Sequence, residues 1–114
     1  MDRKKELKEF YKQLKTDMGI YIIESKNNNK YYLETSQNLK GKMNSAKFQL
    51  EMGSHRNYEL QKAWKEYGST NFEIKILEEL EYDKDESKTD YSEELEIMKT
   101  IWEEKLLKQN KQPY

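Results

Sequence analysis

The stretch that most constrains the fold of this chain is 18–35, where a polar turn separates two apolar, aromatic-rich runs. Residues 20–23 and 31–33 are isoleucine, tyrosine or leucine. Strands favour β-branched and aromatic side chains of this kind. Lys26 and the three asparagines that follow it tolerate turn geometry. The stretch therefore predicts a β-hairpin.

Composition limits the chain to one domain, because 114 residues of which 34% are apolar can fill only one small core. The absence of cysteine excludes a disulfide framework, a zinc–cysteine site and a thiol nucleophile. No apolar run reaches the length of a membrane span, and 1–6 lacks the apolar core of a signal peptide, so we expect no membrane and a cytoplasmic protein. A net charge of -1 means that any nucleic-acid surface must be a local patch.

Four segments have the apolar spacing of amphipathic helices. The first, 3–15, precedes the hairpin, and we expect it to pack on the domain as an N-terminal unit of 1–17; a partner-binding helix is the alternative. The other three segments follow the hairpin, at about 38–52, 57–67 and 91–108. Ser36 or Asn38 can cap the first of these three, and Gly53 and Gly68 can end the first and second.

The segment 71–77 predicts a third strand with one buried face, because apolar and charged side chains alternate along it. An acidic segment at about 78–90 is expected to be a solvated loop. The resulting element order indicates an α+β protein. We expect the following residues to be mostly buried: Ile20, Ile22, Leu39, Met43, Leu50, Leu60, Trp64, Phe72, Ile74, Ile76, Leu95 and Trp102.

Several motifs along 18–80 resemble the GIY-YIG nuclease family. Gly19-Ile20-Tyr21 matches the first motif of that family, and Tyr32-Leu33-Glu34 matches the second with glutamate in place of glycine. Further similar segments follow in the same order, at 36–39, 52–55, 60–61, 64–68 and 71–78. The resemblance implies a three-stranded antiparallel sheet packed by helices over 18–114, to which the N-terminal helix is an addition.

The resemblance also implies phosphodiester hydrolysis. In active members a hairpin tyrosine acts on the attacking water, an arginine on the first core helix stabilises the phosphate, and a glutamate on the last helix holds a divalent metal. Tyr21 and Tyr32 match the motif tyrosines. Lys42 stands at the arginine position, where it keeps the charge without the planar fork. His55 resembles a loop histidine and is expected to support the site or contact phosphate; a general base is the alternative.

Two further positions change chemical type around the scissile phosphate. Lys99 stands where the resemblance places the metal-binding glutamate, and lysine cannot ligate a divalent cation. Glu34 replaces the second-motif glycine, and we predict that it pairs with Lys99 or Lys42 in place of a metal. The alternative is a displaced metal ligand, Glu96 or Glu103, holding Mg²⁺ or Mn²⁺ on the same helix.

A basic patch gives the best electrostatic case for nucleic acid. Its six members are Lys40, Lys42, Lys47, Arg56, Lys62 and Lys65. The alternative is a solvated pair of helix faces.

Three functions are compatible with these features. The first is a GIY-YIG nuclease-like domain that is catalytically impaired or inactive and acts as a nucleic-acid-binding or interaction module. The second is an active DNA endonuclease that depends on a divalent metal, and the third is a regulator that acts only through protein contacts. DNA and a protein are thus both candidate partners, and no cofactor is expected except Mg²⁺ or Mn²⁺ for the endonuclease.

Overall fold

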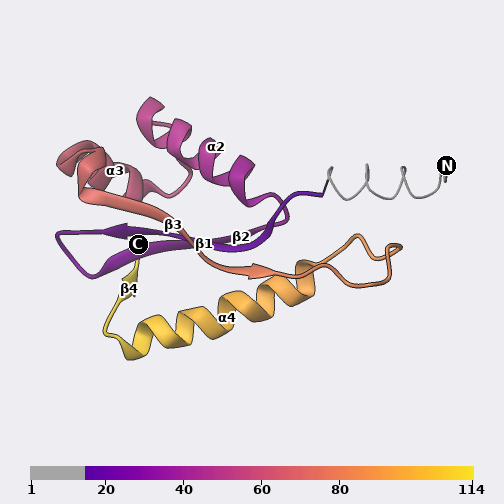
Figure 1. The fold of residues 1–114 in the computed structure, drawn as a ribbon. Helices are drawn as coiled ribbons and strands as arrows, with labels where there is room; N and C mark the ends of the chain where they lie inside the picture. Colours follow the sequence, from indigo (N-terminus) through magenta and orange to yellow (C-terminus); the bar gives the residue numbers. More distant parts are fainter. Residues whose placement is uncertain (1–14) are drawn as a thin grey trace.

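The computed structural model describes residues 15–114, which build one sheet with helices on both faces (Figure 1). The strand order is β3-β1-β2-β4. The strands are β1 (Met18–Ser25), β2 (Lys30–Ser36), β3 (Phe72–Leu80) and β4 (Gln112–Pro113). β1 is antiparallel to both β2 and β3, whereas β4 runs parallel to β2. The α+β class and the three antiparallel strands are confirmed, and β4 is a fourth strand that the sequence did not predict.

Local capping signals set the helix ends. The helices are α2 (Leu39–Met52), α3 (Tyr58–Tyr67), the short 3-10 helix η1 (Ser69–Asn71) and α4 (Ser92–Lys108). Asn38 caps α2 by accepting a hydrogen bond from the backbone N–H of Gly41, and Asn57 caps α3 in the same way. Gly53 ends α2 in the left-handed conformation, at φ 77°. None of the described helices is long and apolar enough to cross a membrane.

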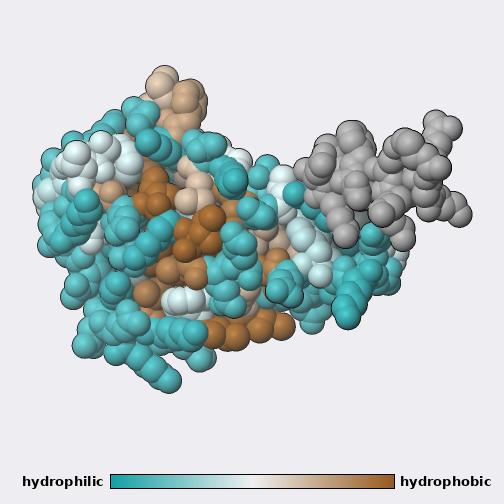
Figure 2. Space-filling view, in the orientation of Figure 1, coloured by the Kyte–Doolittle hydropathy of each residue, from teal (hydrophilic) through white to brown (hydrophobic). Residues whose placement is uncertain are grey.

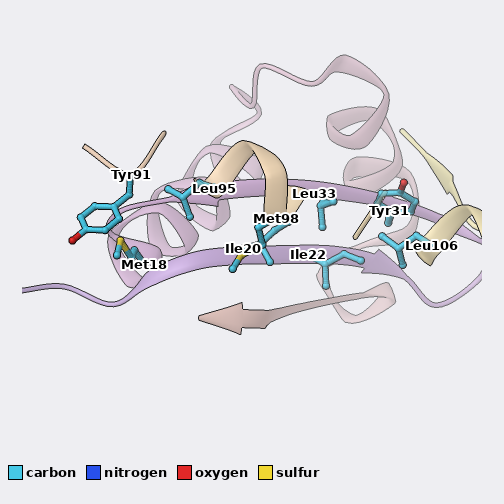
Figure 3. Close-up of a cluster of buried hydrophobic side chains, with 9 residues drawn as sticks. All are labelled: Met18, Ile20, Ile22, Tyr31, Leu33, Tyr91, Leu95, Met98 and Leu106. Atoms are coloured by element: carbon cyan, nitrogen blue, oxygen red, sulfur yellow. The ribbon is translucent and has the colours of Figure 1, made fainter. Parts of the chain in front are cut away.

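The two faces of the hairpin are covered by different helices, because successive side chains of a strand point to opposite sides. Met18, Ile20 and Ile22 pack with α4 (Figure 3). Tyr21 and Ile23 face the opposite way, into a cluster with α2 and α3. The sheet is therefore the middle of three layers, with α2 and α3 above it and α4 below it in Figure 1.

Four of the expected core residues are only partly buried: Met43, Ile74, Ile76 and Trp102. Ile74 and Ile76 belong to β3, which is an edge strand. Trp102 packs at the margin of the α4 cluster, and its indole N–H donates to the carboxylate of Glu78. In Figure 2 hydrophobic surface remains visible between the upper and lower helices.

The acidic loop begins later in the chain than expected. β3 continues through Leu80, because Glu78 and Glu79 pair with Ile20 and Gly19 of β1. The acidic loop therefore begins at Glu81 and not at about 78. The helix expected at 3–15 lies outside the described residues except for Lys15.

Gly19 permits the close approach of β1 to β3 beside the motif tyrosine. A Cβ atom at this position would collide with the backbone carbonyl of Glu78. The β1–β3 register shifts between Ile20 and Tyr21, immediately after this contact. Glycine is therefore required where the backbone of β3 approaches the strand that carries Tyr21.

Candidate functional site

The carboxylate of Glu34 is the centre of the candidate site, because four cationic or hydroxyl groups contact it. β2 places Glu34 opposite Tyr21 of β1 and on the same face as Tyr32. Its Oε2 atom accepts hydrogen bonds from the hydroxyls of Tyr21 at 2.8 Å and Tyr32 at 3.0 Å. Its Oε1 atom accepts one from the Arg56 guanidinium at 2.9 Å. The Lys42 ammonium of α2 lies 3.5 Å from the same oxygen.

These contacts fix the charges of the site. Burial raises the pKa of Glu34, but the hydrogen bonds from Tyr21 and Tyr32 and the charges of Lys42 and Arg56 outweigh it, so the pKa is lowered overall. Burial, reinforced by Glu34, raises the pKa of Tyr21 far above the usual value. Burial also raises the pKa of Tyr32. At neutral pH the site therefore holds an ionised carboxylate and two neutral tyrosines.

Arg56 links Glu34 to Tyr32. Besides its contact with Glu34, it donates from Nη2 and Nε to the Tyr32 hydroxyl, at 3.2 and 3.4 Å. The sequence placed Arg56 only in the nucleic-acid patch and gave no sign of this second role. Arg56 brings a planar guanidinium fork to the site from the loop between α2 and α3, whereas Lys42 brings a single ammonium group.

His55 packs against Tyr32 and is only 8% exposed. Its ring meets the Tyr32 ring edge-on, with 5.0 Å between the centroids. Its Nδ1 atom accepts a hydrogen bond from the backbone N–H of Asn57. Burial, together with the charges of Arg56 and Lys42, lowers the pKa of His55, so the ring is neutral at pH 7. In this structure His55 is thus a neutral packing partner of Tyr32 whose Nδ1 atom is occupied by a backbone N–H.

Glu34 has one of the two ion-pair partners expected for it. Lys42 is in contact, whereas the ion pairs recorded for residues 15–114 include none of Lys99. Lys99 instead lines two hollows between α4 and β2, one shared with Glu103 and the other with Glu96. Within residues 15–114 no three His, Cys, Asp or Glu side chains are grouped so that they could hold a metal ion. The described residues therefore contain no ready-made group of three metal ligands.

The six basic residues expected to form one patch are divided among several places. Three of them line one hollow beside the start of α3: Arg56, Lys62 and Lys65. Lys47 lines a different hollow, between α2 and β3. Lys40 is exposed in the first turn of α2, and Lys42 faces Glu34. The structure thus separates a compact basic hollow from three lysines of α2.

Comparisons with known proteins agree with this fold, although no family model matches the sequence. Intron-associated endonuclease 1 of Enterobacteria phage T4 is 36% identical over 67 residues. This match covers 59% of the chain and 27% of the phage protein, so the chain corresponds to about a quarter of that relative.

Two solved structures are also similar. The catalytic domain of homing endonuclease I-TevI matches with a TM-score of 0.63 and 28% identity, covering 78% of this chain and 87% of that one. A mutant of the same catalytic domain matches with a TM-score of 0.64 and 26% identity, over 80% and 84% of the two chains. Fold and sequence are therefore both similar to those of a nuclease catalytic domain.

Proposed function

Because the fold is similar to that of a nuclease catalytic domain and the hairpin resembles the GIY-YIG motifs, we propose that this chain is a catalytically impaired nuclease-like domain that binds nucleic acid without cleaving it. The observation that carries this proposal is the environment of Glu34. A carboxylate and a phosphodiester are both anions that accept hydrogen bonds from the same donors. Glu34 therefore occupies, from within the chain, the donors that a scissile phosphate would need.

The last helix supports the same proposal. Lys99 supplies a positive charge at the position where the resemblance places a metal-binding carboxylate. Glu96 and Glu103 flank it, but both are exposed, and neither belongs to a three-ligand group in the described part of the chain. Glu34 is the carboxylate that contacts the tyrosines, and its two oxygens are already held by four side chains, which a divalent ion would have to displace.

An active metal-dependent DNA endonuclease remains the second candidate. The observation that favours it is that Tyr21, Tyr32 and His55 are brought together, as catalysis in this family would require. Both tyrosine hydroxyls lie within 3.0 Å of one point, the Oε2 atom of Glu34. Three differences from the family pattern separate this arrangement from a working one: Lys99 at the glutamate position, Lys42 at the arginine position and Glu34 at the glycine position.

An assay of cleavage and binding distinguishes the two candidates. Purified protein is incubated with supercoiled plasmid and with single-stranded DNA, in Mg²⁺ or Mn²⁺, and binding is followed by fluorescence anisotropy. We expect binding without cleavage. The matched control is Tyr21→Phe, which removes only a hydroxyl. Cleavage by the natural chain that Tyr21→Phe abolishes would establish the endonuclease, and absence of all DNA binding would refute the proposed binding function.

A further inference from the structure

A hollow of about 320 Å³ lies beside the start of α3, and its lining contains three basic side chains and no acidic one. The basic side chains are Arg56, Lys62 and Lys65. The chain as a whole carries a net charge of -1, so this concentration of positive charge is local. Such a hollow is an electrostatic site for an anionic ligand.

The helix and the preceding turn explain why these side chains gather. Tyr58, Lys62 and Lys65 are four and three residues apart, which puts them on one face of α3. The opposite face packs into the core through Leu60 and Trp64. Gly53 leaves room for the Lys65 stem, since a Cβ atom there would lie 3.2 Å from Lys65 Cε.

Tyr58 gives the hollow a second chemical property. Its side chain lines the hollow and is 77% exposed, the most exposed large hydrophobic residue of the described chain. An accessible aromatic ring next to cations is the combination that binds single-stranded nucleic acids, where bases stack on the ring and phosphates meet the charges.

We propose that this hollow binds an unpaired nucleotide of a nucleic-acid strand, with its base on Tyr58 and its phosphates on Lys62 and Lys65. The nucleotide must be unpaired because stacking within a duplex covers both faces of each base. This inference rests on the proposed nucleic-acid binding and specifies its substrate. Arg56 belongs both to the hollow and to the Glu34 site, so a strand held in the hollow passes beside Glu34.

The test compares a labelled single strand with a duplex of the same length. Tyr58→Ala should weaken binding of the single strand by about 5- to 150-fold, the effect of one base stacked on an aromatic ring. Duplex binding should change less than twofold. Tyr58→Phe keeps the ring and should retain affinity. Tyr67→Ala is the matched control, because Tyr67 is also exposed on α3 but does not line the hollow.

Salt dependence tests the phosphate contacts separately. Lys62→Ala and Lys65→Ala should each reduce the logarithmic salt slope for the single strand by about 0.7. Lys108→Ala, at the end of α4 on the other face of the sheet, should leave it unchanged. If Tyr58→Ala behaves like Tyr67→Ala, or weakens the duplex as much as the single strand, the hollow does not bind an unpaired nucleotide, although nucleic-acid binding stands. If the natural chain binds neither probe, the proposed function itself is refuted.

Discussion

The two faces of the sheet share the same strands but differ in character. Toward α4, the hairpin contributes Met18, Ile20 and Ile22 to a cluster of apolar and aromatic side chains. Toward α2 and α3, it contributes Tyr21 and Ile23. Both buried polar side chains of the described chain are on the α2/α3 side of the sheet: His55 in the α2–α3 loop and Gln61 in α3.

Hydrogen bonds explain how the α2/α3 face tolerates these polar groups. Gln61 donates to the carbonyl of Leu50 and accepts from the backbone N–H of His55. His55 in turn accepts from the backbone of Asn57. A buried polar group is costly when unpaired and nearly neutral when paired, so these bonds fix the α2–α3 loop and with it Arg56. The α4 face thus contributes stability, and the α2/α3 face contributes both stability and the site.

The largest predicted effect tests this division with one substitution on each face. Trp64→Ala should lower the free energy of unfolding by about 3–5 kcal/mol and Leu95→Ala by about 2–5 kcal/mol, because both side chains are buried. Trp64 belongs to α3, which also carries Lys62 and Lys65, and its ring stacks on that of Phe72 with 5.2 Å between the centroids. Only Trp64→Ala should therefore also weaken DNA binding by the folded protein. Urea unfolding and anisotropy measure the two effects. A melting temperature unaffected by Trp64→Ala would contradict this packing.

The second prediction concerns acid, which should destabilise the α2/α3 face in two steps. His55 has a lowered pKa in the folded state, so its contribution is present above about pH 6.5 and declines as the pH falls further. Glu34 also has a lowered pKa, so its contribution is present above about pH 4.5 and is lost as the pH falls through the folded-state value. Glu34→Gln should therefore remove only the second step.

Urea unfolding of both proteins at pH 7, 5.5 and 3.5 measures these steps. The difference in unfolding free energy between the natural chain and Glu34→Gln should keep its full value at pH 7 and 5.5, where the carboxylate is ionised, and should be smallest at pH 3.5. A difference that stays constant over this range would mean that the carboxylate of Glu34 does not hold its four partners in solution.

Local signals allowed most of the fold to be predicted. The ends of α2 and α3 follow from Asn38, Asn57 and Gly53, whose effects act within one turn. β4 has no such signal, because two residues carry no periodicity. It forms through long-range backbone bonds, including one from the N–H of Tyr114 to the carbonyl of Tyr31.

Tyr21, Tyr32 and Glu34 were identified as site residues through the resemblance to the GIY-YIG motifs, and strand alternation is the physical reason that they meet. Tyr21, Tyr32 and Glu34 share one face because they are paired or two residues apart. Lys42 was identified because it stands where the resemblance places an arginine on the first core helix. The approach of Arg56 was not predictable, since it lies 22 residues from Glu34 and reaches it only through the packing of α2 and α3 on the sheet.

The smallest predicted effect tests whether α4 takes part in the site. Lys99 lies three residues after Glu96 and four before Glu103. Lys99→Glu therefore places like charges at both helical spacings, and it should lower the free energy of unfolding by about 0.4–1 kcal/mol in all. Lys99→Gln removes the charge without reversing it, and as the matched control it should have a smaller effect.

Combining Lys99→Glu with Glu34→Gln decides between the two partners expected for Glu34. Since Lys42 and Arg56 hold Glu34, the two substitutions should be additive within about 0.5 kcal/mol in urea unfolding. Coupling well above that value would mean that Lys99 and Glu34 interact directly across β2. In that case the α4 face would share the electrostatics of the site, and the contrast between the two faces of the sheet would have to be abandoned.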